Sequence, residues 1–118
     1  MGMQVGHLEL FVPDPTLAKD FYKNVLGFEI GDVQHDGAVV WMTHGNTTIL
    51  LRPGTPYQAA SYQDASIAMV LYCDDLDKQV ADMKNRGLVF KGTDGSDRCL
   101  TFTDPFGNWF QLVNPEEQ

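Results

Sequence analysis

The sequence predicts an α+β fold in which two βαβββ modules follow one another along the chain. Each half shows one amphipathic helical segment among short strands rich in β-branched and aromatic residues. Turn and capping residues recur at a nearly constant offset, in the pairs Asp14 and Asp75 (61 positions), Gly27 and Gly87 (60), Gly45 and Gly107 (62), and Pro53 and Pro115 (62). A period this long indicates duplication of one supersecondary unit rather than a short-repeat solenoid.

The length of 118 residues favours a single domain that covers residues 1–118. Within it we expect module one at about 4–53, a linker at about 54–65 and module two at about 66–115. The run RPGTPYQAASYQDA, residues 52–65, breaks the hydrophobic periodicity with two prolines and a glycine, which is typical of a linker.

Composition argues against some classes of function. Acidic residues outnumber basic ones 16 to 8, and the net charge of −8 argues against a nucleic-acid partner, whose phosphates require a basic surface. No apolar run is long enough to span a membrane and the first residues lack a signal-peptide pattern, so we expect no membrane partner and a cytoplasmic location. Cys73 and Cys99 are expected to be reduced thiols, because no CxxC motif or secretory pattern accompanies them.

The first module begins with a strand over residues 5–12, in which apolar and more polar residues alternate. Asp14 is a typical N-cap and Pro15 suits the first helical position. Apolar residues at helical spacing predict an amphipathic helix over 15–26, which Gly27 ends. Three further strands are expected at 28–33, 39–43 and 47–51.

The second module repeats this order of elements. A strand over 67–73 precedes a helix over about 76–86, in which Leu76, Val80 and Met83 share one face. The remaining strands are expected at 88–91, 98–103 and 109–113, and a solvated tail follows at 115–118.

The last two strands are joined by the motif Asp104-Pro105-Phe106-Gly107-Asn108. Pro105 fixes φ and Gly107 accepts a positive φ, so the motif predicts a tight turn and a closing hairpin. Gln111 lies in the middle of the final strand between two large apolar residues. A polar residue in that position faces either solvent or a cavity.

These motifs resemble the vicinal oxygen chelate superfamily, which includes glyoxalase I, bleomycin-resistance proteins and extradiol dioxygenases. The matching runs are HLELFV at 7–12, DFYKNVLGF at 20–28 and FTDPFGN at 102–108. The resemblance implies that each module forms a curved half-open sheet, that two modules enclose a cleft, and that such chains usually dimerise. A small-molecule ligand and a second copy of the chain are therefore the expected partners.

In metal-dependent members of that superfamily, His and Glu side chains from the first and last strands of each module hold a divalent ion. The corresponding positions here are His7, Ile49 (or Leu50, if the register differs by one), Ala68 and Gln111. One imidazole and one neutral amide are fewer donors than a catalytic metal site needs. We therefore expect no cofactor and no metal; if a divalent ion bound, His7 and Gln111 would be its ligands.

Strand alternation indicates which side chains would line the cleft, because residues two apart in a strand share a face. The predicted ligand-binding residues are His7, Glu9, Phe11, Trp41, Arg52, Tyr72, Trp109 and Gln111. A largely aromatic and apolar lining with a few polar groups is typical of a small-molecule site. Core packing is the competing interpretation of Trp41 and Trp109.

Three functions are compatible with these residues. The preferred one is a protein without the usual catalytic metal that binds an aromatic or amphipathic ligand in the cleft. The first alternative is a metal-dependent lyase, isomerase or dioxygenase that uses His7 with nonstandard partners such as Glu9, His35 or His44. The second is a metal-free enzyme in which His7 and Glu9 are the catalytic acid and base.

Overall fold

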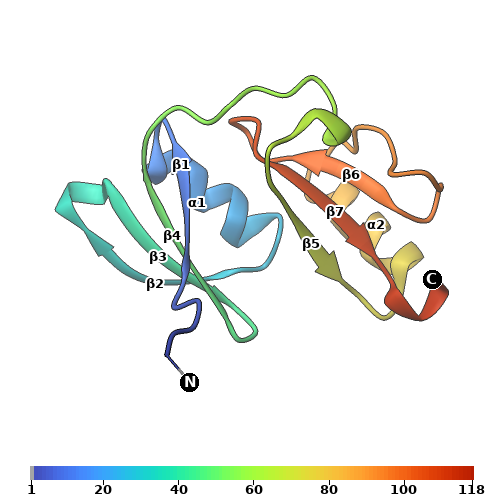
Figure 1. Cartoon of the computed structure of the whole chain (residues 1–118), viewed down its shortest axis with the longest axis horizontal. Helices are drawn as coiled ribbons and strands as arrows, with labels where there is room; N and C mark the ends of the chain where they lie inside the picture. The colour runs from blue at the N-terminus through green and yellow to red at the C-terminus, as the bar shows by residue number, and fades with distance from the viewer. Residues whose placement is uncertain (1) are drawn as a thin grey trace. The chain divides into compact units, whose positions relative to one another are not determined.

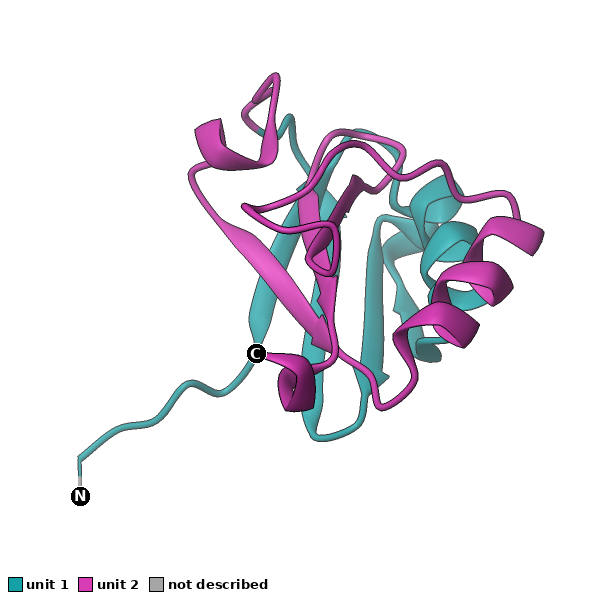
Figure 2. Ribbon diagram, turned by 90° about the vertical axis from the view of Figure 1, so that its right-hand side faces the viewer, with its two compact units in different colours: residues 1–56 teal, residues 57–118 magenta. Residues whose placement is uncertain are grey.

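The computed structural model describes residues 2–118 and divides the chain into two compact units, Met1–Pro56 (unit 1) and Tyr57–Gln118 (unit 2) (Figure 2). Each unit carries one α-helix and one sheet, which confirms the predicted α+β class and the tandem arrangement of similar modules. Across residues 2–118, no helix has the length and apolar character needed to span a membrane.

Unit 1 holds one α-helix and a four-stranded sheet (Figure 1). Its elements are β1 (Leu8–Val12), α1 (Pro15–Asn24), β2 (Glu29–Gln34), the 3-10 turn η1 (His35–Gly37), β3 (Val39–His44) and β4 (Thr47–Pro53). The strand order is β1-β4-β3-β2, with β1 parallel to β4 and the other neighbours antiparallel. The first strand starts at Leu8 rather than at residue 5, and the helix ends two residues before the predicted boundary.

Helix α1 begins where the sequence predicts, because the Asp14 carboxylate accepts a hydrogen bond from the Leu17 N–H at 3.1 Å. A cap of this kind is worth about 1 kcal/mol. The helix contacts β3 and β4 and covers one face of the sheet. The fully buried side chains of this layer are Val12, Ala18, Tyr22, Val40, Met42, Ile49 and Leu51.

Unit 2 repeats the arrangement with three strands. Its elements are η2 (Tyr62–Asp64), β5 (Ala68–Tyr72), α2 (Leu76–Asn85), β6 (Leu100–Thr103), β7 (Trp109–Val113) and η3 (Pro115–Glu117). The strand order is β5-β7-β6, with β5 parallel to β7. Leu8 pairs with Ile49 in unit 1 and Ala68 pairs with Trp109 in unit 2, so partners are 41 residues apart in both units.

The strand predicted at residues 88–91 is wrong, because those residues form no strand in the structure. Pairing with the β6 region is confined to the end of this segment and the residues just after it. The Lys91 N–H donates to the Thr101 carbonyl at 2.7 Å, the Thr101 N–H donates to the Gly92 carbonyl at 3.1 Å, and Thr93 forms an isolated bridge with Leu100. Gly92 has φ +85, a left-handed conformation that interrupts an extended backbone. In place of a fourth strand, this module has only a few backbone hydrogen bonds between the segment around residues 91–93 and the β6 region.

The closing hairpin turns around a buried aspartate. Asp104 is 2% exposed, and its Oδ1 accepts hydrogen bonds from the backbone N–H groups of Phe106 and Asn108, both at 2.9 Å. Its Oδ2 accepts from the Asn108 side-chain amide at 2.9 Å, and Gly107 takes φ +94. The predicted tight turn is confirmed, and the acid of the motif supplies the acceptors that hold it.

Candidate functional site

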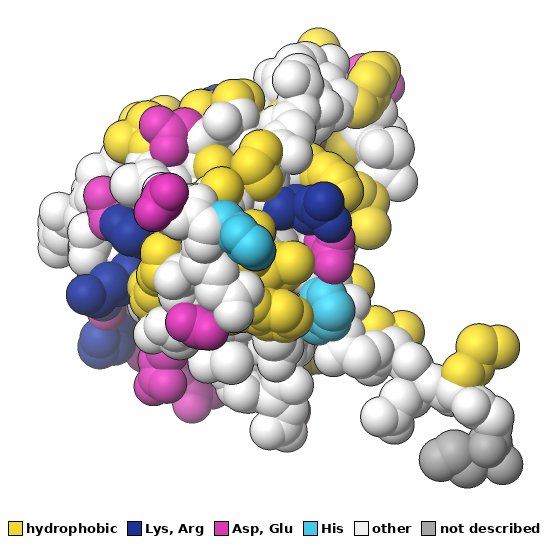
Figure 3. All heavy atoms as spheres, turned by 90° about the vertical axis from the view of Figure 1, so that its left-hand side faces the viewer, with side chains coloured by type: hydrophobic (Ala, Val, Ile, Leu, Met, Phe, Trp, Pro, Cys, Tyr) yellow, Lys and Arg dark blue, Asp and Glu magenta, His cyan; other side chains and the backbone are white. Residues whose placement is uncertain are grey.

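Five of the predicted site residues lie together on the face of the unit 1 sheet opposite the buried layer. Glu9 and Trp41 are both paired with Leu50, and Phe11 is paired with Arg52, so these residues share a face. We call His7, Glu9, Phe11, Trp41 and Arg52 the His7 cluster. Figure 3 shows one face of the molecule, on which histidine, acidic and basic side chains lie among hydrophobic ones.

Glu9 is the centre of the His7 cluster, because each of its carboxylate oxygens contacts a different partner. Oε2 lies 3.0 Å from His7 Nε2, and Oε1 accepts a hydrogen bond from Arg52 Nη1 at 3.0 Å. The His7 hydrogen bond, and next the Arg52 hydrogen bond, lower the pKa of the Glu9 carboxyl. Glu9 is therefore ionised at neutral pH and fixes the position of both basic side chains.

Aromatic rings complete the His7 cluster. The His7 ring meets the Trp41 ring edge-on with centroids 4.9 Å apart, and the Arg52 guanidinium lies over the Phe11 ring at 5.5 Å. Phe11 is 41% exposed, so part of its ring is accessible to a ligand. The cluster thus presents aromatic surface beside charged groups.

Two residues that support the His7 cluster were not predicted. Gln34 accepts a hydrogen bond from the Trp41 indole N–H at 3.3 Å. Gly54 leaves room for Phe11, since a Cβ built on it would lie 3.0 Å from the Phe11 Cβ. The register of β2 against β3 could have indicated Gln34, whereas nothing in the sequence signals the close approach of Gly54 to Phe11.

The remaining predicted residues, Tyr72, Trp109 and Gln111, share one face of the unit 2 sheet. In that sheet Ala68 is paired with Trp109 and Val70 with Gln111, and strand alternation adds the exposed Tyr72. Gln111 is 8% exposed, and its amide donates to the Tyr62 hydroxyl at 2.8 Å and to Asp94 Oδ2 at 3.2 Å. Its side-chain N–H groups therefore already have acceptors within unit 2.

The second half of the predicted linker is built into unit 2. Gln58 donates to the Phe106 carbonyl at 2.8 Å, and the Ala59 carbonyl accepts from the Trp109 indole at 3.1 Å. Gln63 donates to the Thr93 carbonyl at 3.0 Å. These bonds hold residues 58–63 on the sheet face that carries Trp109 and Gln111. Sequence reasoning missed this role, because the segment has no periodic pattern.

The structure shows the surroundings of the four residues that the resemblance places at the superfamily's metal-ligand positions. The residue of β4 that shares a face with Glu9 is Leu50, whereas Ile49 is buried in the opposite layer. Together with Ala68, this leaves two apolar side chains among the four positions. His7 Nε2 is engaged by Glu9, and the Gln111 amide points its N–H groups at Tyr62 and Asp94.

The other histidines do not join His7. The His44 ring stacks on Phe28 with centroids 4.6 Å apart, and His35 lies in η1. Within residues 2–118 there is no group of three or more His, Cys, Asp or Glu side chains that could hold a metal ion. Both cysteines are free thiols.

The fold, two tandem modules each with one helix and a mixed sheet, defines the class to which the chain belongs. A sequence profile of the Glyoxalase/Bleomycin resistance protein/Dioxygenase superfamily matches residues 4–112. The chain belongs to this superfamily, as the motifs of the sequence indicate.

One sequence relative and two solved structures are similar to this chain. Mitochondrial methylmalonyl-CoA epimerase of Bos taurus is 32% identical over 94 residues, covering 70% of this chain and 54% of the epimerase, so the chain spans about half the length of that relative. TnmS3, an antibiotic binding protein from Streptomyces sp. CB03234, is 25% identical with a TM-score of 0.72 over 98% of both chains. The fosfomycin resistance protein FosX of Listeria monocytogenes shares the fold, with a TM-score of 0.76, 19% identity and coverage of 99% and 97%.

Proposed function

We propose that this protein binds an aromatic or amphipathic small molecule on the His7 cluster. The observation that carries the proposal is the convergence of side chains from β1, β3 and β4, together with His7, on one partly exposed sheet face. Phe11 and Trp41 offer apolar surface, while His7, Glu9 and Arg52 offer polar contacts that orient a ligand. The similarity to an antibiotic binding protein over almost the whole chain supports this class of function.

We further propose that binding does not use the superfamily's divalent metal. Leu50 and Ala68 bring no donor atom, and Gln111 is a neutral amide whose N–H groups face acceptors. A catalytic divalent ion normally has at least three protein ligands. The residues of this chain at the four expected positions do not fit such a site.

Calorimetric titration with 2-naphthamide, a planar neutral aromatic, tests the proposed site. We expect Phe11→Ala and His7→Ala to weaken binding about tenfold or more, since each removes aromatic contact worth roughly 1.4 kcal/mol or above. Tyr57→Phe is the matched control, because Tyr57 is exposed and outside the cluster. Unchanged affinity in both cluster variants, with their fold verified by circular dichroism, would rule out this site.

A metal-free enzyme is the second candidate, and the contact of 3.0 Å between His7 Nε2 and Glu9 Oε2 favours it. When Nε2 carries the proton and donates it to Glu9, Nδ1 is left as an acceptor and can remove a proton from a carbon acid. The similarity to an epimerase suggests methylmalonyl-CoA as the first substrate to test.

Solvent deuterium incorporation into methylmalonyl-CoA separates the three candidates. Exchange that persists in EDTA and disappears in His7→Ala indicates the metal-free enzyme. Exchange that requires added Co²⁺ or Mn²⁺ indicates the metal-dependent enzyme. No exchange under either condition, combined with 2-naphthamide binding, indicates a binding protein.

We also propose that the protein is a homodimer, as is usual for chains that resemble this superfamily. Exposed apolar side chains on β1 and β5, including Leu8, Val70 and Tyr72, are compatible with a further contact surface. Light scattering coupled to size-exclusion chromatography tests this proposal, and a mass near 13.2 kDa at all concentrations would contradict it.

A further inference from the structure

We infer that the ligand of the His7 cluster carries a carboxylate, which binds the edge of the Arg52 guanidinium formed by Nε and Nη2. The inference rests on the proposed function, since it names the chemical class of the molecule held by the same site. It follows from the geometry of Arg52, from a comparison with a second arginine of this chain, and from the charge around Glu9.

Arg52 uses only part of its hydrogen-bonding capacity. A guanidinium has five N–H donors arranged so that each of two edges can donate hydrogen bonds to a carboxylate. Nη1 of Arg52 donates to Glu9 Oε1 at 3.0 Å, and among residues 2–118 neither Nε nor Nη2 has a partner. The Arg52 side chain is 49% exposed, so this second edge is accessible to a ligand.

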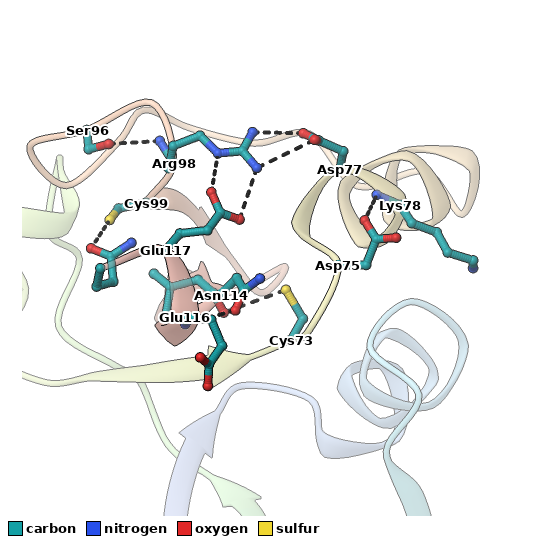
Figure 4. Close-up of polar contacts among 12 residues, drawn as sticks. Cys73, Asp75, Asp77, Lys78, Ser96, Arg98, Cys99, Asn114, Glu116 and Glu117 are labelled. Atoms are coloured by element: carbon teal, nitrogen blue, oxygen red, sulfur yellow. Dashed lines mark hydrogen bonds and ion pairs between the residues drawn. The ribbon is translucent and has the colours of Figure 1, made fainter.

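Arg98 shows what a fully used guanidinium looks like in the same chain (Figure 4). Its Nε and Nη2 donate to the two oxygens of Glu117 at 2.7 and 3.1 Å, and its Nη1 donates to Asp77 Oδ1 at 2.8 Å. Arg98 thus has a carboxylate on each side, whereas Arg52 has one carboxylate on the Nη1 side. Glu117 binds the Nε and Nη2 edge of Arg98, and we assign the same edge of Arg52 to the carboxylate of the ligand.

The charge of the site is compatible with one additional negative group. Glu9 is ionised, and its carboxylate contacts Arg52 only at Nη1, so a second carboxylate at Nε and Nη2 meets the guanidinium on a different edge. A carboxylate on the Nε side approaches the guanidinium away from Glu9. The Nε–H and Nη2–H groups lie in one plane and can donate to both oxygens of a carboxylate at once. The Phe11 ring beneath the guanidinium places aromatic surface next to that carboxylate.

Paired titrations of 2-naphthoate and 2-naphthamide test the inference, because the two probes differ only in the anionic group. We expect 2-naphthoate to bind wild-type protein about fivefold or more tightly, the effect of roughly 1 kcal/mol typical of a partly exposed ion pair. Arg52→Gln should make the two affinities equal. Arg52→Lys should keep only part of the preference, since it keeps the positive charge but loses the two parallel N–H donors that bind both carboxylate oxygens.

Two further variants make the result specific to Arg52. Glu9→Gln should increase the preference for 2-naphthoate, because it removes the negative charge nearest to the ligand. Arg86→Gln removes one positive charge elsewhere and should leave the preference unchanged. In ¹⁵N-labelled protein, the Arg52 Nε–H resonance should move further on saturation with 2-naphthoate than on saturation with 2-naphthamide, because only 2-naphthoate brings a charged acceptor to Nε.

The outcomes distinguish this inference from the proposed function. Equal wild-type affinities for both probes, or a preference that persists in Arg52→Gln, would overturn the carboxylate and leave the aromatic site intact. Failure of both probes to bind the wild-type protein would overturn the inference and the proposed site together.

Discussion

The side-chain amide of Gln111 donates a hydrogen bond to the Tyr62 hydroxyl at 2.8 Å, which joins the middle of β7 to a residue 49 positions earlier in the chain. Tyr62 also meets the Trp109 ring edge-on, with centroids 6.3 Å apart. Gln111 therefore holds the irregular segment around Tyr62 against the sheet of unit 2.

Removal of the Tyr62 hydroxyl should destabilise the protein. In Tyr62→Phe the partly buried Gln111 amide loses one acceptor and keeps Asp94, so we expect the free energy of unfolding to fall by about 1 kcal/mol. Urea denaturation measures this change. Tyr57→Phe serves as the matched control, since Tyr57 is exposed and should lose no stability. Equal stability of both variants and wild type would show that the Gln111–Tyr62 bond contributes nothing.

Gly54→Ala should weaken ligand binding without touching a polar group. A Cβ at residue 54 would lie 3.0 Å from the Phe11 Cβ and 3.2 Å from its Cγ, so Phe11 must shift and the Arg52 guanidinium above it must follow. We expect the affinity for 2-naphthamide to fall by about threefold to tenfold, in line with the loss of packing of roughly 1 kcal/mol. Gly6→Ala is the control, because a Cβ at that position meets nothing within 4 Å. An affinity that is the same in both variants would contradict the role of Phe11.

The ion pairs of Arg98 with Asp77 and Glu117 should make stability depend on pH in the acidic range. Hydrogen bonds from Arg98 lower the pKa of Asp77 and of Glu117 below their ordinary values of 3.8 and 4.5. A lowered pKa in the folded state stabilises the protein above the unfolded-state pKa, and this contribution disappears as the pH falls through the folded-state pKa.

Arg98→Gln should therefore be less stable than wild type at pH 7, and the difference should shrink below about pH 4. Denaturation midpoints measured between pH 7 and pH 3 check this prediction. Lys78→Gln is a comparison on α2, the helix that carries Asp77: it removes the contact with Asp82 at 2.6 Å and leaves the contacts of Arg98 in place. A difference between Arg98→Gln and wild type that stays constant down to pH 3 would show that Arg98 does not act through these carboxylates.

Local patterns in the sequence were sufficient to predict most of the fold. The caps at Asp14 and Asp75, both helices and the closing hairpin depend on residues within a few positions of one another. The fourth strand of unit 2 was mispredicted because residues 88–91 have a strand-like composition but make few ladder bonds, and Gly92 directly after them takes a positive φ. Backbone conformation at a single glycine is not encoded in periodicity.

Local sequence patterns also predicted part of the candidate site. Strand alternation predicted that Glu9 and Phe11 share a face. The pairing of β4 with β1 and β3, which brings Trp41 and Arg52 to the same face, was visible only in the structure. Alternation does not reveal which polar group contacts which, so the shared position of Glu9 between His7 and Arg52 was visible only in the structure. The polar character of Gln111 in an apolar strand is visible in the sequence, but its partners Tyr62 and Asp94 lie in irregular segments whose positions depend on the folded chain.

The most direct test of the proposed site is a ¹H–¹⁵N titration with 2-naphthamide that follows the indole N–H resonances of Trp41 and Trp109. Trp41 contacts the His7 ring and donates to Gln34, so a ligand on the His7 cluster must change its environment. We predict a saturable shift of the Trp41 resonance that is lost in Phe11→Ala. A shift confined to Trp109, or no shift of Trp41 at saturating 2-naphthamide, would contradict the proposed binding site.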